Sequence, residues 1–596
     1  ISEVEKVLPL SASALKSIAS DLQKGLSDLL PKIKSLPGRD GTEIQMTIDQ
    51  TKSLSDKATE ALNICNVISN AKSLGHETSI IAFEGSKWEN RNVDKQLPKT
   101  AENPVLIKRT AVLGEHLPIP IVLFNITDQY LNVRVDYENI DGIKITALRS
   151  INTITSLGGE SWDPLPEIDE SSIITIPPLK SREVWLDLDL ANADAREYKF
   201  NIQFQSLNGA GIIDAPRSPL GIPSPETKVE IDLDVLPFEM ALSGEFRLCT
   251  WSPSTGPEVE GLLSHGNNVF LIPNGKIEYN THDEIISIDY SELELLVEQF
   301  SGKDVFFLIH GQPAINGEFA SEKYEKDYKH YLADLLAYLT SKGIDLKHFA
   351  LYPIDEPGGS GWDAVNKVIK FGEMAHKVDP EFMLYQDGGG ELPMFKAMSK
   401  YLDVWVPPFE WLALDTPEMD VMRNTGELLW SYNCSYASAR PIGPNIKGIN
   451  LIYEYRTAAL LALRNGVSGI GYWAYNAGGE DLWSRNKFEY SLVYPGRTFS
   501  VTSRRWEAVR EGIEDYRILF ELKKHLKDEK LNNVLRDKIQ HLINVSLPGF
   551  IDPIAQAVKY GQSRNMIDNL ASETKMDQFR EEMIECINLL LEKSEL

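Results

Sequence analysis

The chain has 596 residues, of which 42% are hydrophobic and 25% are charged, values typical of globular proteins. Its length predicts three or four domains. The formal net charge of −27 creates a field that repels phosphates, which argues against nucleic acid and anionic membranes as partners. No apolar run approaches the roughly eighteen residues that a membrane span needs.

Residues 1–80 predict an antiparallel helical hairpin. Apolar residues recur at steps of three and four, first at Leu15, Ile18, Leu22, Leu26, Leu29 and Ile33, and again at Ile44, Ile48, Leu62, Cys65 and Ile68. Pro37 and Gly38 separate the two stripes. We expect a packing or homo-oligomerisation element here rather than part of a catalytic site.

Residues 81–240 predict a β-sandwich. Short β-rich runs are separated by Pro, Gly and Asn at 105–109, 119–124, 131–137, 173–176, 184–188, 198–204 and 228–236. Structural support of a neighbouring catalytic domain is the simpler role for this module, and sugar binding is the alternative.

Residues 241–525 predict a (β/α)8 barrel. Apolar strands at 246–251, 268–272, 305–309, 348–353, 382–385, 404–407, 428–432 and 469–472 alternate with helical stretches. Successive parallel strands need helical crossovers, and eight such repeats close a sheet into a barrel. The last helix is predicted from Ser503, its N-cap, to about Lys524. A C-terminal helical extension is predicted over 526–596.

Two adjacent carboxylates, Asp355 and Glu356, follow the fourth strand. Active sites of such barrels lie at the C-terminal ends of the strands. Adjacent like charges beside an apolar strand raise one carboxyl pKa, which a general acid near neutral pH requires. Since side chains alternate along a strand, at least one of the pair must lie on the loop. A helix cap or a surface acidic pair is the alternative reading.

The seventh strand ends in Tyr432 and Asn433, and lacks the Glu that a two-carboxylate retaining barrel enzyme would carry there. The remaining carboxylates near the strand ends are Asp387, Glu410, Glu480 and Asp481. Each could be a second catalytic group, and each could equally be a solvated loop residue.

Aromatic residues also gather at the strand ends, where they predict a platform for the apolar faces of a sugar. The substrate-binding candidates are Trp251, Tyr385, Asp387, Trp411, Tyr432, Trp473, Tyr475 and Asn476. Trp473 and Tyr385 are the first choices among the rings, although core packing must account for some of them.

Other chemistries lack their sequence signatures. The chain has no GxGxxG, Walker, HExxH or GxSxG motif, and its four cysteines form no CxxC pair. We therefore expect no cofactor and no metal. Gly388, Gly389 and Gly390 are most simply a loop after the fifth strand.

Several segments together resemble glycoside hydrolase family 123. They are the strand that ends in Asp355-Glu356-Pro357, GYWAYN at 471–476, YPG at 494–496 and, most specifically, SRRWEAVREGIEDY at 503–516. The resemblance covers roughly 105–525. It implies a β-N-acetylgalactosaminidase-like enzyme that retains configuration by substrate assistance, with Glu356 as acid/base and Asp355 orienting the 2-acetamido group. It also implies a glycan substrate and a secreted, periplasmic or cell-surface location.

Two alternatives remain open at this point. One is a conventional two-carboxylate glycosidase that acts on a different sugar. The other is a glycan-binding or scaffold protein that keeps the barrel without turnover, against which the intact Asp355-Glu356 pair counts.

Overall fold

A computed structural model describes the chain in two compact units. It covers all residues except 1–8, 38–39, 74–77, 90–91, 100–101, 156–157, 208–225, 413–415, 434–446, 448–450, 477–481, 485–490, 561 and 593–596. The first unit comprises 1–87, 91–152 and 165–238, and the second comprises 88–90, 153–164 and 239–596. Within the described ranges, no helix is both long and apolar enough to cross a membrane.

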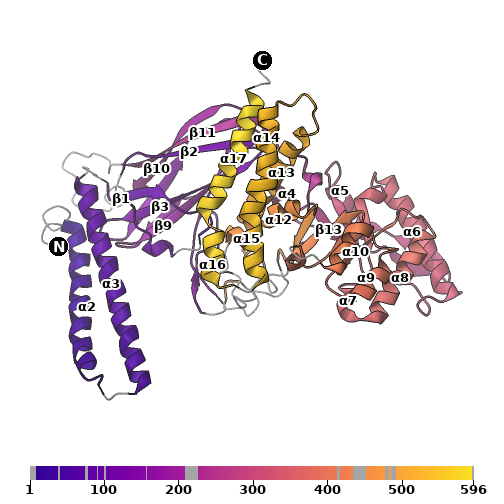
Figure 1. Ribbon diagram of the computed structural model, residues 1–596, viewed down its shortest axis with the longest axis horizontal. Coiled ribbons are helices and arrows are strands. Elements are labelled where there is room, and N and C mark those ends of the chain that lie inside the picture. Colours follow the sequence, from indigo (N-terminus) through magenta and orange to yellow (C-terminus); the bar gives the residue numbers. More distant parts are fainter. Residues whose placement is uncertain are drawn as a thin grey trace. The chain divides into compact units, whose positions relative to one another are not determined.

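In the first unit, helices α2 (Pro9–Lys34) and α3 (Gly41–Ser73) form a hairpin that extends from the sheets, as Figure 1 shows. One end of the hairpin packs on the sheets through a cluster of Leu15, Ile64, Ile68, Ala71, Ile81, Phe124, Ile126 and Leu179. Further along the helices, part of the predicted stripe faces solvent, because Leu26, Ile48 and Leu62 are 50%, 50% and 61% exposed.

Two antiparallel sheets follow, and they form a sandwich. One sheet has the order β1 (Ile80–Glu84), β3 (His116–Asn125), β9 (Ser181–Asp189) and β5 (Lys144–Arg149). The other has the order β2 (Val105–Leu113), β11 (Thr227–Glu239), β10 (Glu197–Ser206), β4 (Leu131–Tyr137) and β8 (Ile173–Ile176). Alternate residues face the shared core, as Tyr198, Phe200, Ile202 and Phe204 do on β10.

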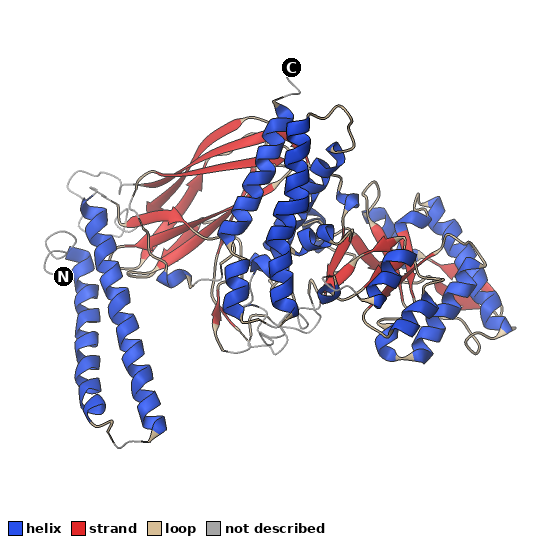
Figure 2. Cartoon of the chain, viewed as in Figure 1, coloured by secondary structure: helices blue, strands red, loops and turns tan. Residues whose placement is uncertain are grey.

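The second unit is built on a parallel barrel of eight strands, which confirms the predicted fold class (Figure 2). The strands are β12 (Arg247–Cys249), β13 (Val269–Ile272), β16 (Phe306–His310), β17 (Phe349–Tyr352), β18 (Met383–Asp387), β19 (Val404–Val406), β20 (Leu428–Leu429) with β21 (Ser431–Asn433), and β22 (Gly469–Tyr472). The seventh strand is divided at Trp430: β20 pairs with β19, and β21 pairs with β22. The amide of Trp430 donates to the carbonyl of Trp405 at 2.9 Å, so the sheet closes on itself.

Helices follow the strands around the barrel. They are α4 (Glu258–Ser264), α5 (Ser291–Gln299), α6 (Glu322–Ser341), α8 (Trp362–His376), α9 (Leu392–Met398), α10 (Pro417–Thr425), α12 (Ala458–Arg464) and α13 (Arg504–His525). A two-stranded ribbon of β14 (Lys276–Tyr279) and β15 (Ile285–Asp289) precedes α5. The C-terminal part is helical, with α14 (Asn533–His541), α15 (Leu547–Lys559), α16 (Arg564–Leu570) and α17 (Glu573–Leu591).

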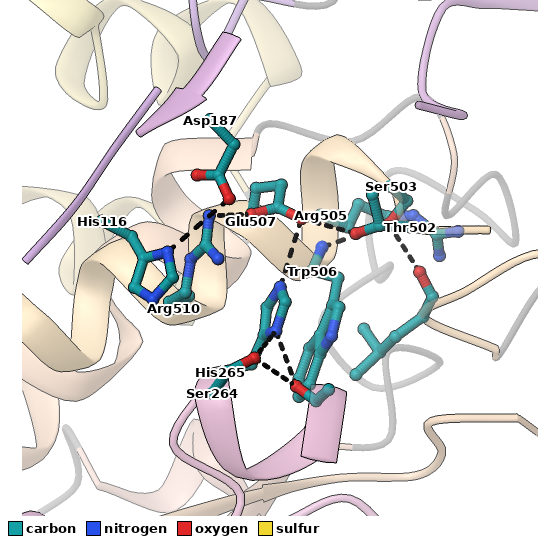
Figure 3. A network of polar contacts seen from close by, with 12 residues as sticks. His116, Asp187, Ser264, His265, Thr502, Ser503, Arg505, Trp506, Glu507 and Arg510 are labelled. Carbon is teal, nitrogen blue, oxygen red and sulfur yellow. Dashed lines mark hydrogen bonds and ion pairs between the residues drawn. The ribbon is translucent and has the colours of Figure 1, made fainter. Parts of the chain in front are cut away.

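Helix α13 carries the closing motif, and its contacts are those of a buried structural element. Ser503 caps it as predicted, since its hydroxyl accepts from the amide of Trp506 at 3.1 Å. The ring of His265 stacks on Trp506 at 4.8 Å, and its Nε2 lies 3.2 Å from Glu507, which also accepts from Thr502 (Figure 3). These contacts join α4 to the start of α13.

Residues 153–164 lie within the range that the sequence assigns to the sandwich, yet they belong to the second unit. They include the short strands β6 (Thr153–Ile154) and β7 (Glu160–Ser161). Asp163 forms a buried ion pair with Arg505, with Nε and Oδ2 3.0 Å apart, and it also accepts from Tyr494 at 2.7 Å. This polar anchor to α13 explains the placement of the segment.

Candidate active site

Alternation along the strands determines which side chains enter the barrel. The interior cluster contains Phe306 and Leu308 of β16, Ala350 and Tyr352 of β17, Met383 and Tyr385 of β18, and Val404 and Val406 of β19. These are every second residue of each strand. One further step along β18 is Asp387. The same period on the seventh strand gives Trp430 and then Tyr432, which packs against this cluster.

Asp355 and Glu356 lie on the turn between β17 and the short helix α7 (Pro357–Ser360). Both side chains are exposed. Glu356 has φ 42° and ψ 55°, a left-handed conformation that costs a residue with a side chain about 1 kcal/mol or more. Its carbonyl accepts from the amides of Gly359 and Ser360 at 3.1 and 3.2 Å, which closes the turn. This strained turn directs the adjacent carboxylates to one end of the barrel.

Each member of the pair accepts a hydrogen bond from a different tyrosine. The hydroxyl of Tyr352 is 2.6 Å from Oδ1 of Asp355, and the hydroxyl of Tyr432 donates to Oε1 of Glu356 at 2.6 Å. Tyr352 ends the fourth strand, whereas Tyr432 comes from the seventh. The two carboxylates are therefore held by hydroxyl groups from two different strands.

Asp387 is a third carboxyl group in contact with the pair. Its Oδ2 lies 2.7 Å from the hydroxyl of Tyr352, and its Oδ1 accepts from the amide of Glu356 at 3.2 Å. Only 3% of the residue is exposed. Burial raises the pKa of Asp387 to about 7, although the hydrogen bond with Tyr352 acts in the opposite direction. Asp387, next to the pair, is therefore a carboxyl group with a raised pKa at this end of the barrel.

The three glycines after β18 pack closely against the turn that carries Asp355 and Glu356. Gly388 has φ +85°, and a Cβ atom added there would lie 2.9 Å from Cγ of Glu356. A Cβ on Gly390 would lie 3.2 Å from Cα of Gly358. Glycine is needed at these positions because the two loops approach within van der Waals distance. The Gly-rich loop is therefore a packing surface for Glu356.

Four of the predicted aromatic residues have partly or largely exposed side chains. Trp473 is 43% exposed, and Trp251, Trp411 and Tyr432 are half-buried. The rings of Trp251 and Tyr432 meet edge to face at 6.2 Å. A Cβ on Gly471 would lie 2.7 Å from the Trp251 indole, so this glycine of β22 leaves room for the ring.

Two other predicted rings are buried, and the expectation of sugar stacking is corrected for them. Tyr385 is 2% exposed and lies in the barrel interior, 4.6 Å from the ring of Tyr352. Tyr475 is 4% exposed, and its hydroxyl donates to Glu258 at 2.7 Å. Neither ring has an open face for a sugar. Asn476 follows Tyr475 and is exposed.

Sequence reasoning missed two residues of this site. Tyr352 connects Asp355 with Asp387, and the inward period of β17 could have identified it. His310 ends β16, is exposed, and has its ring 5.0 Å from that of Tyr352. Of the other carboxylates considered, Glu480 and Asp481 lie outside the described residues, as does the side chain of Glu410. In the part of the chain that the structure describes, no three His, Cys, Asp or Glu residues are grouped to hold a metal ion.

Comparisons with known proteins show similarity to glycoside hydrolases. Residues 311–522 match the family model of the glycoside hydrolase 123 catalytic domain. A family 123 glycoside hydrolase from Clostridium perfringens is similar in structure, with a TM-score of 0.56 and 13% identity, over 86% of this chain and 100% of its own. A family 39 glycoside hydrolase from Bacteroides cellulosilyticus WH2 aligns with a TM-score of 0.33 and 11% identity, over 70% of this chain and 83% of its own. No curated protein matches the sequence.

The matched range begins directly after β16 and ends within α13, so it contains the turn with Asp355 and Glu356, the Gly-rich loop and the closing motif. The predicted family resemblance is confirmed over this range. Residues 311–522 of the chain are thus similar to the catalytic domain of glycoside hydrolase family 123.

Proposed function

We propose that the chain is a retaining glycosidase that cleaves β-linked N-acetylhexosaminides, with N-acetylgalactosamine favoured, by substrate assistance. The observation that carries the proposal is the pair Asp355-Glu356, with each carboxylate held by the hydroxyl of a different tyrosine. Two neighbouring carboxylates with different hydrogen-bond donors can perform two different tasks on one sugar ring.

Glu356 is assigned the acid/base role. It donates a proton to the glycosidic oxygen as the bond to the anomeric carbon breaks, and later removes a proton from the attacking water. Tyr432 restrains Oε1 of Glu356 through its 2.6 Å hydrogen bond. The exposed side chain can reach a leaving group that enters from solvent.

Asp355 is assigned to the 2-acetamido group. The acetamide oxygen attacks the anomeric carbon and forms a cyclic oxazolinium ion, while Asp355 accepts the amide N–H and faces the positive charge. Water then opens the ring with net retention. Because the nucleophile belongs to the substrate, the enzyme needs no carboxylate at the end of the seventh strand, where Tyr432 stands. Asp387 is poorly suited to attack, since it is buried and its carboxyl group is hydrogen-bonded on both oxygens.

Sugar binding is assigned to the more exposed rings, Trp251, Trp411, Tyr432 and Trp473, with Asn476 as a polar partner. The Clostridium perfringens relative is described in connection with hydrolysis of glycolipid glycans. The glycan of a glycolipid is accordingly the first natural substrate class to test for this chain.

Matched chromogenic β-glycosides test the proposal. The 2-acetamido compounds should be hydrolysed, whereas the corresponding 2-hydroxy sugars should not, and a thiazoline analogue of the oxazolinium should inhibit competitively. Covalent trapping of a sugar on Asp387 or Glu410 would establish the two-carboxylate mechanism instead. Glycan binding without turnover of any compound would favour the non-catalytic alternative.

A further inference from the structure

The number of hydrogens available to the Tyr352 hydroxyl indicates the protonation state of the carboxyl groups around it. Its hydroxyl oxygen lies 2.6 Å from Oδ1 of Asp355 and 2.7 Å from Oδ2 of Asp387, and both distances are those of O–H···O hydrogen bonds. A tyrosine hydroxyl has only one hydrogen, and an ionised carboxylate has none. For both contacts to be hydrogen bonds, one of the two carboxyl groups must hold a proton and donate it to Tyr352.

Burial decides which carboxyl group holds it. Asp387 is 3% exposed, whereas the side chain of Asp355 is exposed. Removing an ionised carboxylate from water is costly, so the neutral form is favoured on the buried residue. Oδ1 of Asp387 already accepts from the amide of Glu356, which leaves Oδ2, the atom facing Tyr352, as the position for the hydrogen.

The surroundings of Asp387 support this assignment. Burial, with a smaller contribution from the two neighbouring carboxylates, raises its pKa to about 7 against the opposing effect of its hydrogen bonds. The titratable groups that face it in the described structure are Tyr352 of β17, Asp355 and Glu356 of the following turn, Tyr385 of its own strand and Cys249 of β12. None of these is a cation that would hold Asp387 as an anion.

We propose that Asp387 is a protonated positioning residue, which donates to Tyr352 and thereby commits the single hydroxyl hydrogen of Tyr352 to Asp355. The chain Asp387–Tyr352–Asp355 holds the carboxyl group of Asp355 in a fixed orientation. Through the amide of Glu356, the same buried carboxyl group also fixes the backbone of the acid/base residue. The expected effect of Asp387 on turnover rests on the proposed function, in which Asp355 binds the acetamide of the substrate.

The inference predicts an alkaline limb in the pH profile. When Asp387 loses its proton, Tyr352 has one hydrogen and two carboxylate acceptors, so Asp355 is no longer held by a committed donor. The kcat for a 2-acetamido substrate should therefore fall as pH rises through about 7, the pKa raised by burial.

Two substitutions of Asp387 separate the neutral from the charged form. In Asp387→Asn, the amide nitrogen can donate to Tyr352 while the amide oxygen accepts from Glu356, as the protonated acid does. Asp387→Leu has the same branching and number of side-chain heavy atoms but neither the donor nor the acceptor. We expect Asp387→Leu to lower kcat about 10- to 100-fold, and Asp387→Asn to recover most of that loss while its alkaline limb disappears. An Asp387→Asn enzyme as impaired as Asp387→Leu at every pH would overturn the proposal.

Tyr352→Phe is the companion variant, because it keeps the ring and removes the bridging hydroxyl. It should lower kcat more than it changes KM, and it should reduce the benefit of Asn over Leu at position 387 to the part that comes from the contact with the amide of Glu356. If Asn still exceeds Leu by the same factor when each is combined with Tyr352→Phe, the chain through Tyr352 is wrong. Melting curves on all variants show whether each is folded.

A spectroscopic measurement tests the proton without any substrate. The infrared carbonyl band of a neutral carboxylic acid should appear at about pH 6 in the difference between the unmodified protein and Asp387→Asn, and should vanish at about pH 9. Asp355→Asn should keep this band. Its absence would overturn the proton assignment, whereas its presence without turnover of any 2-acetamido substrate would leave the assignment intact and refute the proposed function.

Discussion

The hydroxyl of Tyr432 donates a hydrogen bond of 2.6 Å to Oε1 of Glu356. Tyr432 is on the seventh strand of the barrel and Glu356 follows the fourth, and β18 and β19 separate the two in the closed sheet. The end of the seventh strand thus supplies a hydrogen-bond donor to the proposed acid/base residue. This agrees with a reaction in which the nucleophile comes from the substrate.

Tyr432→Phe should lower kcat about tenfold, because it removes one hydrogen bond to a charged group and leaves the ring in place. Glu356→Gln should lower it by about 10² to 10⁴, since the proton donor itself is lost. Both losses should shrink on a substrate with a strongly acidic leaving group. Steady-state kinetics on a pair of leaving groups measures this, and equal losses on both compounds would contradict the acid role.

Gly388→Ala should displace Glu356. The new Cβ would lie 2.9 Å from Cγ of Glu356, and φ +85° is unfavourable for alanine. We expect kcat to fall at least tenfold on an unactivated 2-acetamido substrate, by analogy with other small misplacements of catalytic groups.

Gly343→Ala is the matched control for this change. Gly343 has φ +80° and no atom within 4 Å of an added Cβ, so its substitution carries the same kind of backbone strain without touching the site. Both variants should lose about 1 kcal/mol of stability. If they also lose activity equally, the contact with Glu356 has no catalytic importance.

Stability should depend on pH through Asp387. Its folded pKa of about 7 lies above the ordinary value of about 3.9, so the folded chain binds this proton more tightly than the unfolded chain. The stabilising contribution is complete at low pH and is lost as pH rises through 7. Asp387→Asn removes this titration, and its melting temperature should therefore fall less than that of the unmodified protein between about pH 5 and pH 8. If the melting temperatures of the two proteins fall by the same amount between these pH values, Asp387 is not neutral at the lower pH.

The barrel and the pair Asp355-Glu356 could be predicted because both are local in sequence: one is a repeated strand–helix pattern, the other a dipeptide at a strand end. The link between Asp387 and Tyr352 could not be predicted, since it depends on two neighbouring strands meeting in register and on the burial of one carboxyl group. Tyr475 is a case in which the position in the sequence predicted the wrong environment for the side chain. It follows a barrel strand, yet it turns toward Glu258, a contact that the sequence pattern does not indicate.

Asp163→Asn should destabilise the second unit. Asp163 and Arg505 are 2% and 0% exposed, and loss of the anion would leave the guanidinium buried without its charge partner. Such a change typically costs about 3–5 kcal/mol. Asp552→Asn is the control, because the pair Arg464–Asp552 is 41% and 45% exposed and should contribute less than about 1 kcal/mol. Calorimetric melting of both variants checks this, and equal shifts would mean that burial of Asp163 has no energetic effect.

The helical hairpin should stabilise the first unit and have no part in catalysis. Ile68 is 1% exposed in the cluster that joins the hairpin to the sandwich, whereas Leu62 is 61% exposed on the same helix. Ile68→Asp would bury a charge against apolar side chains and should lower the melting temperature. Leu62→Asp should leave the melting temperature unchanged, and should lower the mass measured by light scattering if the exposed stripe joins two chains.

Deleting residues 1–77 extends the same test. The deletion would expose Ile81, Phe124, Ile126 and Leu179, so lower thermal stability and a tendency to associate are expected. Every residue of the candidate site belongs to the second unit, and kcat on a small 2-acetamido glycoside should therefore stay close to that of the full chain. A melting curve, light scattering and one kinetic assay measure the three properties separately. A truncated protein that remains folded but no longer turns over substrate would place part of the active site on the hairpin.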